Sequence, residues 1–188
     1  IVPAKAEIFE RLKKGGTAVL PPDSEFHDLL RQKAEACGAG KIVSFGKAET
    51  ADVRLLDMSR QEDTVSVLAE VKGAKIAYKI GAPGVHLVSN SLAVLAVCAE
   101  LDLDLALCAM SLSNWSAGSG RGQKHILALP GGEACLIDES YNANPVSMAA
   151  SLETLGTTPR GAMGRHIVVL GDMLELGDSS QDMHEKLS

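Results

Sequence analysis

A strand pattern followed at once by a helix start, between Ala134 and Leu155, constrains the fold more than any other stretch of the chain. Ala134–Ile137 is a short apolar run of the kind that forms a buried strand. Asn144 stands where a helix N-cap belongs, and Pro145 stands at the first helical position. The stretch therefore predicts a βα unit whose polar residues lie in the turn between strand and helix.

That turn carries two carboxylates and two carboxamides, namely Asp138, Glu139, Asn142 and Asn144. In open α/β sheets, ligands bind at the carboxyl ends of the strands, where the N–H groups of the next helix also lack partners. The turn is therefore a candidate binding site. The alternative is a well-capped turn on a solvated surface with no ligand, because Asn and Asp favour turns in any case.

Elsewhere in the chain, helical and strand patterns alternate. Helices are expected at about residues 3–14, 24–37, 85–100 and 103–112, and strands at about 17–20, 41–45, 53–56, 65–71, 76–80, 124–129, 134–137 and 166–170. The order of the first elements is typical of an α/β layer with parallel strands. Lys72-Gly73 then predicts the turn of an antiparallel hairpin.

The apolar spacing also predicts which side of each helix faces the core. The inward residues are expected to be Ile8 and Leu12, with Phe9 as a further candidate; Phe26, Leu29, Leu30 and Ala34; Val88, Leu92, Leu95 and Ala99; and Leu105, Ala109 and Leu112. Aromatic residues make up only 3% of the chain against 46% for all hydrophobic residues, so the core must be largely aliphatic.

Ser116–Gly122 is the best candidate for a linker, because it is rich in glycine and other small residues and has no periodicity. A domain boundary near Gly120 is expected, which divides the chain into residues 1–120 and 121–188. The chain opens without Met and both of its ends fall within helical patterns, which predicts a part of a longer protein.

Charge and cysteine content restrict the partners and the compartment. The net charge of −6 argues against binding to nucleic acid or to an anionic membrane surface. No apolar run approaches the roughly 18–20 residues that a membrane-spanning helix needs, so no membrane insertion is expected. The four cysteines lie far apart without a CxxC pair, which predicts buried free thiols in a reducing compartment over disulfides or a metal site.

Two glycine-rich stretches resemble nucleotide-binding loops only superficially. Gly38–Lys41 is not a P-loop, because the lysine is followed by Ile42 where a Ser or Thr hydroxyl is required. Gly118–Gly122 lacks the spacing of a dinucleotide fingerprint and follows a helix. Its Arg121 could still bind a phosphate through two N–H groups, although a solvated surface charge is the alternative.

Three further polar residues are candidates for binding. Asn90 lies near the start of an expected helix and could contact an adenine edge, or it could simply be a surface residue. Asp172 and Glu175 follow an expected strand at its carboxyl end, where they are either ligand groups or part of a solvated loop.

Taken together, four motifs in this order resemble the Mur ligase family. They are Gly84-x-His86-x-x-x-Asn90-Ser91-Leu92-Ala93, Gly120-Arg121-Gly122, Asp138-Glu139-Ser140-Tyr141-Asn142-Ala143-Asn144-Pro145-x-Ser147-Met148 and Gly171-Asp172-Met173-x-Glu175-Leu176-Gly177. The last two are similar to the MurF type, which adds D-alanyl-D-alanine (D-Ala-D-Ala) to a UDP-N-acetylmuramoyl-tripeptide. The resemblance implies part of a parallel-sheet ATPase domain with an antiparallel hairpin, followed by part of a second, Rossmann-like α/β domain.

The resemblance also implies a role for each candidate residue. Lys5 would be carbamoylated and help to hold Mg²⁺, Asn90 would contact the adenine, and Arg121 would approach the ATP phosphates. Asp138 and Glu139 would lie near the ribose, although the family usually has Asp where this chain has Glu139. The residues implied to face the dipeptide are Asn142, Asn144, Asp172 and Glu175.

The implied activity is ATP-dependent amide-bond formation in the cytoplasm by a monomer, through an acyl-phosphate. Because no P-loop lies in these 188 residues, they are expected to be inactive by themselves. Two alternatives stay open. The parent could be another amide ligase of the superfamily, such as a folylpolyglutamate synthase, or the chain could be a non-catalytic α/β binding module.

Overall fold

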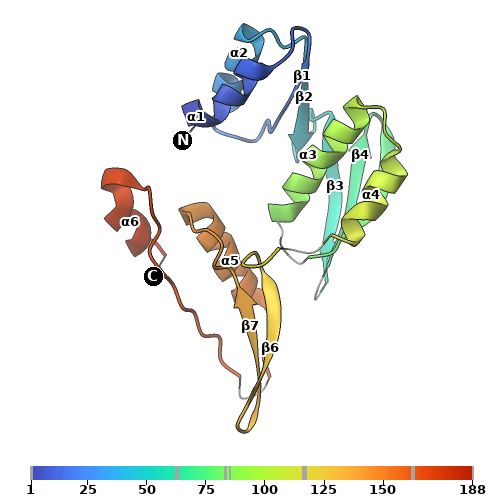
Figure 1. Ribbon diagram of the computed structural model, residues 1–188. Helices are drawn as coiled ribbons and strands as arrows, with labels where there is room; N and C mark the ends of the chain where they lie inside the picture. The colour runs from blue at the N-terminus through green and yellow to red at the C-terminus, as the bar shows by residue number, and fades with distance from the viewer. Residues whose placement is uncertain are drawn as a thin grey trace. The chain divides into compact units, whose positions relative to one another are not determined.

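The computed structural model describes residues 2–61, 64–82, 84, 86–115, 118–161 and 164–187. The chain forms two compact units (Figure 1). The first unit comprises residues 1–81 and 85–115, and the second comprises residues 82–84 and 116–188. Val85, expected to begin a helix, and Ser116 and Ala117 of the expected linker lie outside the described residues.

The first unit is built on a five-stranded mixed sheet with the strand order β1-β2-β3-β4-β5. The strands are β1 (Thr17–Leu20), β2 (Lys41–Gly46), β3 (Val53–Arg60), β4 (Val65–Val71) and β5 (Ala74–Ile80). β1, β2 and β3 run parallel, whereas β4 is antiparallel to both β3 and β5. The predicted strands and the hairpin are confirmed. Lys72 and Gly73 both have positive φ, of 49° and 80°, as a two-residue hairpin turn requires.

Helices α3 (His86–Glu100) and α4 (Leu105–Ser113) form the main core with β2–β5. The inward residues of α3 recur every three or four positions, and all four predicted ones are buried: Val88, Leu92, Leu95 and Ala99. β4 supplies the opposing surface, because alternate residues along a strand face the same side; these are Val65, Val67, Ala69 and Val71. The expectation of a largely aliphatic core is confirmed.

A smaller core cluster lies where the N-terminal helices pack against β1. The elements are α1 (Val2–Ala6), the 3₁₀ helix η1 (Glu7–Arg11) and α2 (His27–Ala36), and the buried residues are Ala6, Phe9, Ala18, Leu20 and Ala34. Val19, between Ala18 and Leu20 on β1, packs instead against the main core. β1 is therefore covered on both faces, as expected for an α/β layer.

Two details of these helices differ from the prediction. Ile8, expected inward, is 72% exposed, whereas Phe9 is buried. The predicted α-helix continues as a 3₁₀ helix, in which residues three apart lie above one another, so Phe9 falls on the same side as Ala6. Phe26 and Leu29 are also exposed, because α2 begins only at His27 and presents the later Leu30 and Ala34 to the cluster.

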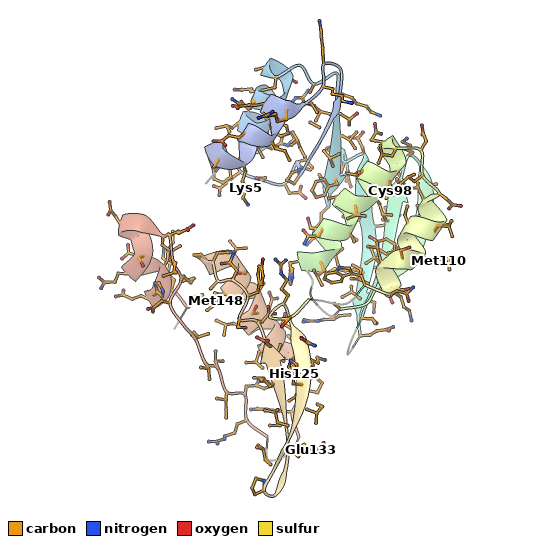
Figure 2. All side chains as sticks on the ribbon, in the orientation of Figure 1. Lys5, Cys98, Met110, His125, Glu133 and Met148 are labelled. Carbon is orange, nitrogen blue, oxygen red and sulfur yellow. The ribbon has the colours of Figure 1, made fainter. Side chains whose placement is uncertain are left out.

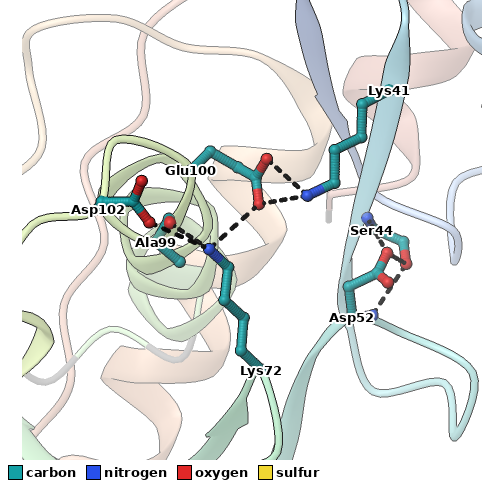
Figure 3. Close-up of polar contacts among 7 residues, drawn as sticks. All are labelled: Lys41, Ser44, Asp52, Lys72, Ala99, Glu100 and Asp102. Atoms are coloured by element: carbon teal, nitrogen blue, oxygen red, sulfur yellow. Dashed lines mark hydrogen bonds and ion pairs between the residues drawn. The ribbon is translucent and has the colours of Figure 1, made fainter.

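The C-terminal end of α3 is tied to the sheet by charged side chains (Figure 3). The Nζ of Lys41 on β2 donates to both carboxylate oxygens of Glu100 at 2.8 Å. The Nζ of Lys72, in the β4–β5 turn, donates to the carbonyl oxygen of Ala99. Cations are favourable at this end of a helix, where carbonyl groups lack partners within the helix.

In its described residues, the second unit contains an antiparallel strand pair, two α-helices and a 3₁₀ helix. Its elements are β6 (Gln123–Leu129), β7 (Gly132–Asp138), α5 (Pro145–Thr157), the 3₁₀ helix η2 (Gly177–Ser179) and α6 (Ser180–Glu185). The βα unit from β7 to α5 confirms the predicted strand–turn–helix. Together, the mixed sheet of the first unit and this βα unit confirm the α/β class.

Two expectations about the second unit are wrong. The β7 segment was expected to be buried, but Cys135 and Leu136 are exposed, because within the described residues β7 pairs only with β6 and no layer buries either side chain. Residues 166–170 were expected to form a strand, but they have no strand assignment, and Val169 is 92% exposed. A strand needs a hydrogen-bonded neighbour, and the described residues supply none there.

All four cysteines are free, as predicted, but they are not fully buried. Cys37, Cys98 and Cys108 are half-buried, and Cys37 and Cys108 border the two core clusters, whereas Cys135 is exposed on β7. Burial, followed by a hydrogen bond with Cys108, raises the pKa of Cys98 from 9.0 to about 11. Among the described helices, none combines the length and apolar character needed to cross a bilayer.

Candidate functional site

The polar turn between β7 and α5 is ordered by its own side chains. Asn144 is the N-cap of α5: its Oδ1 accepts a hydrogen bond from the backbone N–H of Ser147 at 3.0 Å. The Oγ of Ser147 in turn accepts from the N–H of Asn144 at 3.1 Å, which completes a capping box. Pro145 follows at the first helical position. The predicted helix start is confirmed, and one carboxamide oxygen of the candidate site has a structural role.

Asp138, at the end of β7, has a similar local role. Its Oδ1 accepts a hydrogen bond from the N–H of Ser140 at 3.0 Å. Hydrogen bonds from the Ser140 side chain and backbone hold the pKa of Asp138 below its ordinary value of 3.8, so the group is a carboxylate at neutral pH. The Oδ1 of Asn142 accepts from the N–H of Ala143 at 2.9 Å, and the side chain of Glu139 is exposed.

The loop that carries Arg121 is bound to this turn by its backbone. The N–H of Gly122 donates to the carbonyl oxygen of Asp138 at 2.8 Å, and the N–H of Tyr141 donates to that of Gly120 at 3.0 Å. Gly120 has φ +72°, and a Cβ there would lie 2.7 Å from the backbone nitrogen of Tyr141. Only glycine allows this approach without a shift of the backbone.

The guanidinium of Arg121 lies over the ring of Tyr141, with 4.2 Å from Cζ to the ring centroid. The structure therefore brings Arg121 together with the turn from Asp138 to Tyr141. The role of Tyr141 in this contact was not predicted from the sequence. The two glycines that flank Arg121 were the available signal, because they indicate that the backbone passes close to another segment.

The second pair of predicted carboxylates lies in the loop before η2. Asp172 and Glu175 are exposed, and Glu175 has a φ of 61°. Met173 between them is buried, and its N–H donates to Nε2 of His184 at 2.9 Å. Nδ1 of His184 lies 2.7 Å from the carbonyl oxygen of Ser180. No hydrogen bond or ion pair in the described part of the chain joins these carboxylates to the β7–α5 turn.

Lys5 and Asn90 belong to the first unit. Lys5 is exposed on α1 (Figure 2), and Asn90 is exposed on α3, near its start. Within the described residues, no group of three or more His, Cys, Asp or Glu side chains is placed to hold a metal ion. The role of Lys5 in Mg²⁺ binding and that of Asn90 in adenine binding therefore remain predictions.

Both parts of the chain match families of known domains. Residues 1–98 match the Mur ligase middle domain, and residues 128–188 match the Mur ligase glutamate ligase domain. The chain is 30% identical over 186 residues to UDP-N-acetylmuramoyl-tripeptide--D-alanyl-D-alanine ligase of Bacillus subtilis, covering 99% of this chain and 38% of that protein. It is 29% identical to the ligase of the same name from Escherichia coli, covering 98% of this chain and 39% of the relative.

Solved structures of MurF ligases also match this chain. A crystal structure of MurF from Acinetobacter baumannii matches with a TM-score of 0.84 and 27% identity, covering 99% of this chain and 38% of that chain. MurF ligase from Thermotoga maritima, in complex with ADP, matches with a TM-score of 0.76 and 26% identity, covering 99% and 40%. The chain thus spans about two fifths of the length of these relatives. Because residues 1–98, more than half of the 188 residues, match the Mur ligase middle domain, this chain belongs to the Mur ligase family.

Proposed function

We propose that the whole protein containing this chain is an ATP-dependent ligase that adds D-Ala-D-Ala to a UDP-N-acetylmuramoyl-tripeptide, a step in making peptidoglycan precursors. The relatives named for this activity, from Bacillus and Escherichia, align with nearly the whole chain. The observation that carries the proposal is the attachment of the Arg121 loop to the Asp138–Tyr141 turn. It places a cation beside the motif that separates the MurF type from other Mur ligases.

The reaction consists of two substitutions. The terminal carboxylate of the tripeptide attacks the γ-phosphorus of ATP, which forms an acyl-phosphate and releases ADP. The amine of D-Ala-D-Ala then attacks the acyl carbon, an amide bond forms, and inorganic phosphate leaves with the loss of a proton from nitrogen. Phosphoryl transfer depends mostly on positioning and on neutralising the charge of the transferred group.

Arg121 is proposed to contribute that positive charge. A guanidinium presents N–H donors in one plane and can contact two phosphate oxygens at once. ADP bound to the Thermotoga relative supports a nucleotide as the ligand. Asn90 is proposed to contact the adenine, and Asp138 and Glu139 the ribose. The residues proposed to face the dipeptide are Asn142, Asn144, Asp172 and Glu175.

Mg²⁺ is also proposed as a cofactor. The described residues contain no cluster of His, Cys, Asp and Glu that could hold a metal ion. A carbamoylated Lys5 would supply one oxygen-bearing anion, which suits Mg²⁺. When bound, Mg²⁺ neutralises phosphate charge. We also propose that the whole protein is a monomer in the cytoplasm and that its domain boundary in this chain lies near Gly120.

The test is ADP formation by the full-length protein. We expect ADP release to require the tripeptide precursor, and amide product to require D-Ala-D-Ala as well. Arg121→Ala should lower kcat by about 100-fold or more, as for loss of a charge that stabilises a transition state, whereas Arg121→Lys should retain part of the activity. The 188 residues by themselves should release no phosphate above a protein-free blank.

The same assay separates the alternatives. Turnover that requires a folate and glutamate would favour a folylpolyglutamate synthase; the enzyme of that type from Lactobacillus casei shares the fold, with a TM-score of 0.63 and 13% identity. A full-length protein that forms no ADP with any of these substrates would contradict the proposal and favour a non-catalytic binding module.

A further inference from the structure

We propose that Tyr141 is a positioning residue that sets the direction of the Arg121 guanidinium for contact with a phosphate group. This inference rests on the proposed function, in which Arg121 contacts the phosphates of ATP. It goes further in assigning a role to a side chain of the turn that contributes no charge.

The backbone holds the two residues in fixed register. Gly120 and Gly122, on either side of Arg121, each form a backbone hydrogen bond with the turn, to Tyr141 and to Asp138 respectively. The N–H of Arg121 also donates to the carbonyl oxygen of Gly118, at 3.1 Å. The Cα of Arg121 therefore cannot move away from Tyr141 without breaking several hydrogen bonds.

The side chains then stack. The Cζ of Arg121 lies 4.2 Å from the centroid of the Tyr141 ring, within the range of a cation–π contact. Within the described residues, no carboxylate lies within ion-pair distance of Arg121. The ring is thus the contact that orients an arginine side chain which otherwise has many rotamers.

Stacking orients the guanidinium without using its hydrogen-bond donors. The contact with the ring uses the flat face, and the five N–H donors lie in the plane of the group. A carboxylate in place of the ring would compete with a phosphate for the same donors. A tyrosine beside Arg121 is therefore suited to present the arginine to an incoming anion.

The ring of Tyr141 carries this role and its hydroxyl does not. Tyr141 is 66% exposed, and its hydroxyl forms no hydrogen bond with the described residues. Replacement by Phe should therefore preserve the effect, whereas replacement by Leu should remove it. Because the side chain is mostly exposed, neither change should prevent folding.

The experiment is steady-state kinetics of the full-length protein with Tyr141→Phe, Tyr141→Leu, Arg121→Ala and the double variant Tyr141→Leu/Arg121→Ala. We expect Tyr141→Phe to match the unaltered protein and Tyr141→Leu to lower kcat about fivefold, the size of one exposed cation–π contact. The KM for D-Ala-D-Ala should stay unchanged in both. The double variant should be no slower than Arg121→Ala, since Tyr141 acts through Arg121.

The outcomes separate the two proposals. If Tyr141→Leu retains full kcat, if Tyr141→Phe loses as much as Tyr141→Leu, or if the losses add in the double variant, the role of Tyr141 is wrong while the ligase activity stands. If the unaltered protein forms no amide product, the proposed function itself fails. Equal melting temperatures of the variants would show that the changes in kcat do not arise from unfolding.

Discussion

The two units of this chain bury their apolar residues to very different extents. In the first unit, α3 and α4 enclose a continuous, largely aliphatic core with the sheet. In the second, α5 and α6 have no buried residue, and β6 and β7 expose Ile126, Leu129 and Leu136. The candidate site differs, because its hydrogen-bonded β7–α5 turn lies in the second unit. Order in that turn comes from hydrogen bonds rather than from burial.

The contrast shows that one segment of a chain can be ordered by hydrogen bonds while another is ordered by the packing of a core. The side-chain hydrogen bonds within the β7–α5 turn join residues at most three positions apart, and the backbone of the Arg121 loop adds two more; none of these contacts needs a core around it. The core of the first unit depends on contacts between elements distant in sequence. Substitutions should therefore act strongly and broadly in the first unit, and weakly and locally in the second.

The largest effect is expected from a core truncation in the first unit. Leu95, on α3, is fully buried, so Leu95→Ala should lower the free energy of unfolding by about 3 kcal/mol through lost burial and a cavity. Leu129→Ala, on exposed β6, should change it by less than about 0.5 kcal/mol. Urea denaturation followed by circular dichroism measures both. Equal losses would contradict the contrast.

The next largest difference between the two units is expected in the rates at which their cysteines are alkylated. The raised pKa of Cys98, about 11 in place of 9.0, means about 100-fold less thiolate at pH 8 than for an unshifted thiol. Exposed Cys135 should therefore be alkylated by iodoacetamide long before Cys98. Mass spectrometry of the peptides gives both rates in one unmodified sample. Similar rates would show that the environment of Cys98 is not the one described.

A smaller effect is expected at the helix cap. Asn144→Ala removes the capping box and should lower the stability of α5 by about 1 kcal/mol, whereas Asn144→Ser should keep the cap. Hydrogen exchange of the N–H of Ser147 measures this locally, and Asn142→Ala is a control that leaves the cap intact. If Asn144→Ser keeps the exchange protection but loses ligase activity, the residue has a substrate role besides its cap.

The smallest effect is expected in the loss of stability of the first unit as the pH falls. A hydrogen bond and the charge of Lys41, with Lys72 nearby, hold the pKa of Glu100 below 4.5. A lowered folded-state pKa means that Glu100 stabilises the fold above pH 4.5 and that this contribution is lost as pH falls through the folded-state value. Glu100→Gln should therefore reduce the fall in urea midpoint between pH 7 and pH 4. Asp138→Asn, in the second unit, should leave the unfolding of the first unit unchanged.

Much of this structure could be predicted from the sequence, because its strongest signals are local. The spacing of Val88, Leu92 and Leu95 was sufficient to orient α3, and Asn144-Pro145 was sufficient to begin α5. The errors occurred where tertiary context decides. Ile8 faces outward because its helix tightens to a 3₁₀ turn, and residues 166–170 form no strand because a strand requires a neighbour.

The candidate site could be predicted only in part, for the same reason. Motifs identified Arg121 and the residues of the β7–α5 turn, since these are contiguous stretches. They could not indicate that Arg121 stacks on Tyr141, because that contact joins residues 20 positions apart through backbone hydrogen bonds. The roles of Lys5, Asn90, Asp172 and Glu175 remain predictions that the kinetic experiments can test.

The contacts of His184 fix the position of one proton. Because Nε2 accepts the N–H of Met173, that nitrogen carries no hydrogen, and Nδ1, 2.7 Å from the carbonyl oxygen of Ser180, must carry it. The ring is thus the neutral Nδ1–H tautomer. The two ring nitrogens should accordingly have different ¹⁵N chemical shifts, with Nε2 as the unprotonated one.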